Sequence, residues 1–245
     1  MKILILLSLM MLFFSGIACA QYGNFIAQYR VMFNRNFDLP NKSPQYLDGI
    51  LHVKDAAESL FFMVPESIET TTNASVIEIE EDTIWRIRTN LEDQVLFFED
   101  VFNSSMKPRW YADSLFAMRW QLFPDREQID SFYCAKATTY FRGRRYVAWY
   151  DPLLAFPFGP WKFGGLPGLI IKLEDSEQNL QIQLSSIKDT QNPYTLAPIN
   201  PESYSTYLKN IRLLRKLIAG SAHTSDCIDC ETKVSFRSWE IISLK

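Results

Sequence analysis

The residues best suited to chemistry lie close together near the C-terminal end of the sequence. Cys227 and Cys230 are separated by two residues, and His223 lies four positions before Cys227. Two thiols at this spacing can close a small disulfide, or they can join the imidazole as soft or borderline ligands for zinc or copper. A complete metal site would need a fourth ligand from elsewhere. Both interpretations remain open at this point.

No other part of the chain shows the residue pattern of a known catalytic site. The sequence lacks the G-x-S-x-G, H-E-x-x-H, Walker and dinucleotide-binding patterns. Its other histidine, His52, lies in an apolar run and is expected to be an outward-facing strand residue. Acidic neighbours such as Glu80 and Glu81 fall where a strand end and a turn are expected, so we interpret them as solvated. We therefore assign no catalytic residue and expect no cofactor.

The N-terminus is organised like a secretory signal peptide. Lys2 precedes an almost unbroken apolar run that reaches Ile17. Ala18 and Ala20 then form an A-x-A cleavage site before Gln21. The sequence therefore predicts export, and with it a place in the periplasm or cell envelope.

Cleavage at this site removes residues 1–20, including Cys19, which lacks the preceding leucine that a lipoprotein signal usually has. Residues 21–245 contain no second long apolar stretch, so we expect a single domain with no transmembrane segment. The whole chain has 25 basic and 28 acidic side chains and a formal net charge of −3. This leaves no basic excess for neutralising phosphates, so we expect no nucleic-acid partner.

The oxidising compartment favours the disulfide interpretation of the C-terminal cysteines. Oxidation removes the thiolates that a metal would need. We therefore predict a disulfide between Cys227 and Cys230, with a metal site formed by His223, Cys227 and Cys230 as the alternative. Cys134 falls in an expected strand and is interpreted as a buried thiol, although a bridge from Cys134 to either of the other two also fits the sequence.

Short runs of apolar, aromatic and β-branched residues recur along the exported chain. Several alternate with polar residues, which places every second side chain on the same face of a strand. The separating turns are mostly too short for crossover helices, so neighbouring strands are expected to pair antiparallel. The expected strands are residues 25–33, 46–54, 59–64, 76–80, 83–88, 94–98, 116–122, 129–140, 145–150, 169–174 and 180–187.

One helix is expected after the last of these strands. Asn200 can cap it, Pro201 suits its first position, and Gly220 can end it. Apolar residues recur between them at steps of three and four, at Tyr204, Tyr207, Leu208, Ile211, Leu214 and Ile218. The predicted fold class is mainly β, with a single curved antiparallel sheet and a C-terminal packing helix. By fold-level analogy with periplasmic lipoprotein carriers, the sheet can form a half-open barrel.

The stretch between the expected strands 145–150 and 169–174 has the most tightly dictated backbone. Four of the nine glycines of the chain fall here, at Gly159, Gly164, Gly165 and Gly168. Four prolines crowd the same stretch, at Pro152, Pro157, Pro160 and Pro167. This density of glycine and proline predicts an irregular excursion between two strands.

The end of this stretch is the hexapeptide Gly165-Leu166-Pro167-Gly168-Leu169-Ile170. It resembles the signature of the GLPGLI family of exported proteins from Gram-negative bacteria. The upstream runs Cys-Ala-Lys-Ala, Phe-Arg-Gly-Arg and Ala-Trp-Tyr, which start at residues 134, 141 and 148, look like the family's usual approach to it. The resemblance implies an exported, strand-rich domain. It implies no reaction, because the family has no established enzymatic activity.

Two interpretations of the signature remain open. In the first, its leucines and isoleucine seat the entry of a central strand, and its glycines let the backbone pass close to neighbouring strands. In the second, Phe156, Phe158, Trp161 and Phe163 line an apolar recognition groove. The candidate binding or structural residues are Trp149, Gly159, Pro160, Trp161, Phe163, Gly165, Leu166, Pro167, Gly168, Leu169 and Ile170.

These features favour a non-enzymatic envelope protein that binds an apolar ligand, a lipid or an envelope protein partner. The alternative is a metal-binding or metal-handling envelope protein that uses the cluster of His223, Cys227 and Cys230.

The first prediction is that the exported protein begins at Gln21. Cleavage after Ala20 would remove the complete apolar run, because the A-x-A site follows it directly. Intact-mass measurement of protein extracted from the envelope tests this expectation. A mass that includes residues 1–20, or a diacylated Cys19, would contradict it.

We also expect that Cys227 and Cys230 are oxidised to each other in the exported protein and that Cys134 remains a free thiol. Thiol labelling before and after reduction, followed by peptide mapping, distinguishes the alternatives. A bridge that includes Cys134 would show that the pairing is wrong. Three labelled thiols with stoichiometric zinc or copper would support the metal site instead.

Overall fold

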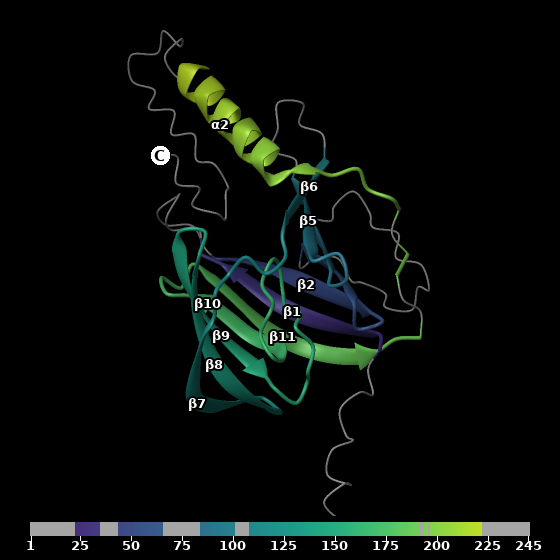
Figure 1. Cartoon of the computed structure of the whole chain (residues 1–245). Coiled ribbons are helices and arrows are strands. Elements are labelled where there is room, and N and C mark those ends of the chain that lie inside the picture. The colour runs from purple at the N-terminus through teal and green to yellow at the C-terminus, as the bar shows by residue number, and fades with distance from the viewer. Residues whose placement is uncertain are drawn as a thin grey trace, which may run out of the picture.

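A computed structural model describes residues 23–34, 44–65, 84–100, 108–191, 194–195 and 197–221 (Figure 1). Residues 1–20, the expected strand 76–80 and the cluster of His223, Cys227 and Cys230 lie outside the described residues. The described strands are β1 (Phe25–Phe33), β2 (Gln45–Lys54), β3 (Glu58–Pro65), β4 (Ile84–Asn90), β5 (Val95–Asp100), β6 (Arg109–Ser114), β7 (Gln121–Ile129), β8 (Phe132–Phe141), β9 (Arg144–Asp151), β10 (Leu169–Asp175), β11 (Leu180–Asp189) and β12 (Glu202–Ser203), and the helix is α2 (Tyr204–Ser221).

The described strands form one 12-stranded sheet in the order β12-β6-β5-β4-β3-β2-β1-β11-β10-β9-β8-β7. Strands β1 to β6 and strands β7 to β11 are two meanders, and the antiparallel pair of β1 with β11 joins them. The short β12 is parallel to β6, whereas the other pairs are antiparallel. The sheet is curved and does not close between β7 and β12 (Figure 1). This architecture confirms the predicted class, a mainly β fold with a single curved sheet and a C-terminal helix.

The strand β1 shows how alternation in the sequence produces the core. Phe25, Ala27, Tyr29, Val31 and Phe33 are buried, and the residues between them are partly or fully exposed. The buried set faces the main hydrophobic cluster, which draws on strands from both meanders. We call this side of the sheet the inner face and the opposite side the outer face.

The outer face carries a second, smaller cluster over β2 and β3. It consists of Ile50, Leu60, Phe62, Val64 and Tyr194. His52 belongs to the same face of β2 as Ile50 and is only 3% exposed. The expectation of an outward-facing His52 is therefore correct in direction only, because Phe62 and Tyr194 cover the imidazole.

The prediction of a strand at residues 116–122 is wrong. Strand β6 ends at Ser114, residues 115–120 form a turn and an irregular segment, and β7 begins only at Gln121. The φ angle of Phe116 is 45°, which is outside the β region. Strand β7 carries mostly exposed side chains, because it lies at the edge of the sheet, so apolar alternation could not reveal it. The run expected as one strand at 129–140 is likewise divided by a turn before Phe132.

The helix α2 begins later than the sequence predicted. Asn200 and Pro201 precede it without capping it, because β12 pairs with β6 between them and the first helical residue. The cap is Ser203, whose hydroxyl oxygen accepts a hydrogen bond from the backbone N–H of Thr206 at 3.2 Å. The helix packs on β5 and β6 through the buried Tyr207. No helix in the described part of the chain is long and apolar enough to cross a membrane.

Candidate functional site

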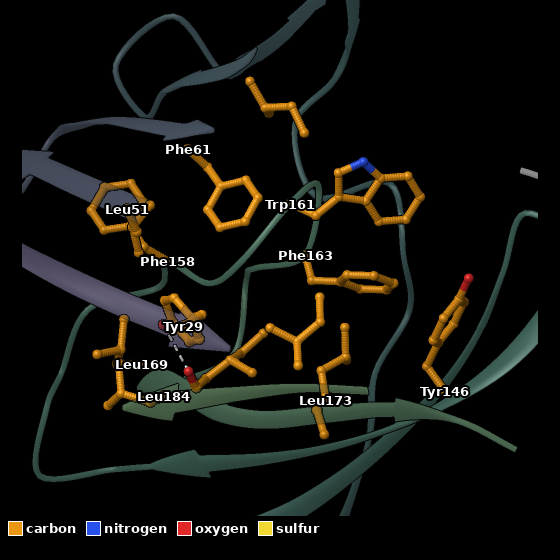
Figure 2. Packing of buried hydrophobic residues seen from close by; sticks show 14 of the residues in the cluster. Tyr29, Leu51, Phe61, Tyr146, Phe158, Trp161, Phe163, Leu169, Leu173 and Leu184 are labelled. Carbon is orange, nitrogen blue, oxygen red and sulfur yellow. Dashed lines mark hydrogen bonds between the residues drawn. The ribbon is translucent and has the colours of Figure 1, made fainter. Parts of the chain in front are cut away.

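The stretch of residues 152–168, here called the signature loop, leaves the end of β9 and crosses the inner face before β10 begins (Figure 2). The loop is folded on itself. The backbone N–H of Gly165 donates to the carbonyl of Pro157 at 2.8 Å, and the N–H of Leu169 donates to the carbonyl of Leu154 at 2.9 Å. These backbone hydrogen bonds give the irregular segment a defined shape, although it does not pair with neighbouring strands.

Four apolar side chains of the signature loop fill the inner face. Phe158, Trp161, Phe163 and Leu166 are 1%, 7%, 2% and 1% exposed. Figure 2 shows the three rings of this group between β2 and β3 on one side and β10 on the other. The loop therefore supplies part of the main core, and its rings do not line an open groove on the surface.

Phe163 is at the centre of an aromatic cluster. Its ring lies 4.6 Å from that of Tyr146, 5.5 Å from Trp161, 5.8 Å from Phe141 and 6.3 Å from Trp120, measured between centroids. The planes meet at tilted or edge-on angles, which is the arrangement that aromatic quadrupoles favour. The loop is thereby packed against β8 and β9 as well as against the first meander.

Two glycines of the hexapeptide meet different steric limits. A Cβ at Gly168 would lie 2.2 Å from the carbonyl oxygen of Asp151 and 3.0 Å from the Cα of Pro152, so backbone atoms occupy the space that a side chain needs. Gly165 has a φ angle of +81°, and a Cβ there would lie 3.0 Å from the Cβ of Phe116. A side chain is therefore excluded at Gly168 by neighbouring backbone atoms, and it is disfavoured at Gly165 mainly by the positive φ angle.

Two side-chain hydrogen bonds attach this region to the rest of the fold. The buried hydroxyl of Tyr29 donates to the carbonyl of Ile170 at 2.9 Å. The indole N–H of Trp120 donates to the carbonyl of Gly164 at 2.8 Å. Burial raises the pKa of Tyr29 well above its usual value, so its hydroxyl remains a donor over the physiological range.

Two cationic side chains, one in the loop and one in the turn after β8, contact aromatic rings, and the sequence analysis assigned neither of them a role. The ammonium of Lys162 lies 3.5 Å from the ring centroid of Phe98, although Lys162 is only 5% exposed. The guanidinium of Arg142 lies 4.0 Å from the ring centroid of Tyr204 and pairs with Asp113 at 2.7 Å. Cations over aromatic faces are attractive. The placement of a lysine between Trp161 and Phe163 was the available signal for the first contact.

The remaining candidate residues of the signature have separate surroundings. Leu169 and Ile170 are fully buried at the start of β10, and Pro160 is buried, whereas Pro167 is exposed. Trp149 lies on β9 beside Lys136 of β8, whose ammonium is 5.6 Å from its ring centroid.

Cys134 is a free and fully buried thiol in β8. Burial, with smaller effects from nearby carboxylates, raises its pKa to about 12. Its thiol is therefore protonated and unreactive near neutral pH. Among the described residues, no group of three or more His, Cys, Asp or Glu side chains is placed to hold a metal ion.

The geometry predicts that Gly168→Ala destabilises the protein by about 1–3 kcal/mol, because the new methyl group must displace backbone atoms. Urea denaturation followed by circular dichroism measures the loss. Gly23→Ala is the matched control, since no atom lies within 4 Å of the added Cβ there. Its effect should stay within about 0.5 kcal/mol. Equal midpoints for both variants would show that the close approach at Gly168 has no energetic weight.

Comparison with known proteins gives a likeness of fold. No family model matches the chain, and no curated protein matches it. It is similar to PNGF-II in two crystal forms, with TM-scores of 0.53 and 0.51, 16% identity in each, and coverage of 79% and 78% of this chain. The matched part is 34% and 33% of the PNGF-II chain, so this chain spans about a third of that length. The LolA superfamily protein NE2245 from Nitrosomonas europaea aligns with 71% of this chain and 90% of its own at 11% identity and a TM-score of 0.33.

Proposed function

We propose that this chain is an exported envelope protein of the GLPGLI type that binds an apolar ligand such as a lipid chain and catalyses no reaction. The cleavage site before Gln21 supports export, and the hexapeptide from Gly165 to Ile170 supports the family. One structural observation carries the binding role. The inner face of the open sheet accommodates an apolar segment, which here is the signature loop of the chain itself.

The signature loop lies on the inner face much as a ligand would. Phe158, Trp161 and Phe163 are buried there, while the backbone around them is irregular and bonds mainly to itself. Apolar contact is non-directional and depends on the area removed from water. A lipid chain of similar width would therefore satisfy the same surface without copying the loop's geometry.

Displacement of the loop is the proposed route of binding. The sheet is open between β7 and β12, so its inner face can widen without the loss of a strand pair. The hydrogen bond from Trp120 to Gly164 and the burial of the loop's apolar side chains oppose this movement. In this proposal they contribute to the free energy that a ligand must supply.

Trp120→Phe is expected to strengthen binding, because it removes the hydrogen bond to Gly164 and keeps an aromatic ring. One hydrogen bond contributes about 1 kcal/mol, which corresponds to roughly a fivefold change in affinity. Titration with a fluorescent fatty acid measures the change. Native mass spectrometry of wild-type protein from the envelope should in addition detect a retained lipid.

Tyr133→Phe is the matched control, because this ring is 56% exposed on β8 and should not affect the inner face. Its affinity should equal that of the wild type. Weaker binding by Trp120→Phe would mean that the loop is a fixed part of the core or of the site. The absence of both retained lipid and probe binding would exclude the proposed role.

A further inference from the structure

The connection from β11 to β12 contacts the outer face of the sheet at Tyr194. Strand β11 lies beside β1, whereas β12 lies beyond β6, so the chain passes six strands on the way (Figure 1). Tyr194 is the buried side chain among the described residues of this connection. It packs on the outer-face cluster, which comprises Ile50, Leu60, Phe62 and Val64. Tyr194 therefore anchors the connection to the sheet.

The contact beneath Tyr194 includes a buried histidine. The ring of His52 stacks on Phe62 at 5.9 Å and 16°, and the ring of Tyr194 meets it edge-on at 5.9 Å and 87°. Within the described part of the chain, neither Nδ1 of His52 nor the hydroxyl of Tyr194 has a hydrogen-bond partner. A charge on this imidazole would thus lose its hydration and find no acceptor at Nδ1 among the described residues, and contact with the ring of Phe62 offsets only part of that cost.

We infer that His52 and Tyr194 form an acid-sensitive latch, which releases the β11–β12 connection from the outer face when His52 is protonated. The neutral imidazole is compatible with the packed contact. The imidazolium is not, because it needs water or a counter-charge. Release of Tyr194 supplies the water and uncovers the apolar side chains of β2 and β3.

The direction of the pH dependence follows from burial, which lowers the pKa of His52 from 6.5 to about 4. The latched form is fully favoured above pH 6.5. The free energy that favours the latched form decreases as the pH falls toward 4, because the imidazole of the open form is protonated at a higher pH.

Other charged groups surround the contact: Asp48 and Lys54 on β2, Asp55 in the following turn, Glu58 on β3, Arg88 on β4 and Lys188 on β11.

Thiol labelling tests the latch at two positions in one protein. An Ile50→Cys variant carries a thiol under the connection, whereas the native Cys134 is buried in the main core. Labelling by a dithiodipyridine is followed by peptide mapping, with rates divided by those of an unfolded reference peptide at each pH. From pH 7 to pH 5, labelling at position 50 should accelerate about 20-fold, since the pKa difference sets the opening equilibrium. It should also remain faster than labelling of Cys134.

Three further substitutions in the Ile50→Cys background assign the effect. His52→Phe should abolish the acceleration, Tyr194→Ala should make position 50 reactive already at pH 7, and Glu58→Gln should leave the acceleration unchanged. Equal rates at position 50 and at Cys134 would mean global unfolding and would overturn the latch. So would acceleration that persists in His52→Phe, or its absence in the parent variant.

Discussion

The structure depends on how an open, curved sheet covers its own inner face. The helix α2 covers this face only at β5 and β6, where Tyr207 and Ile211 join the main hydrophobic cluster. The signature loop packs on this face with three aromatic rings and a leucine. The close approach of Gly168 to the carbonyl of Asp151 allows the loop to return to β10 at the required position. Substitution of that glycine therefore affects the core, although the residue carries no side chain into it.

The loop also joins the two meanders of the sheet. Their backbones meet along the single pair of β1 with β11. The loop arises between β9 and β10, but the ammonium of Lys162 lies over the ring of Phe98 on β5. Side-chain packing through the loop thus adds a second connection between the halves, and a change in the loop must alter how the halves are held together.

Both faces of the sheet receive aromatic side chains from segments that are not strands. An irregular segment contributes aromatic side chains to each face, with Trp161 and Phe163 on the inner face and Tyr194 on the outer face. Both segments have an irregular backbone among their described residues, and their aromatic side chains are buried against the sheet. Aromatic side chains from irregular segments therefore complete the apolar packing on both sides of the sheet.

Local pattern in the sequence determined much of the fold. The strand expected at 25–33 has the same bounds as β1, because alternation over nine residues specifies both the length of the strand and which side chains face the core. The glycine and proline cluster correctly indicated an irregular stretch before Leu169. The polar edge strand β7 and the start of α2 were decided by pairing with β8 and β6, which no local pattern records. Tertiary structure alone buried the rings of the loop and placed Tyr194 over His52, because these contacts join residues that are distant in sequence and adjacent only after the sheet has curved.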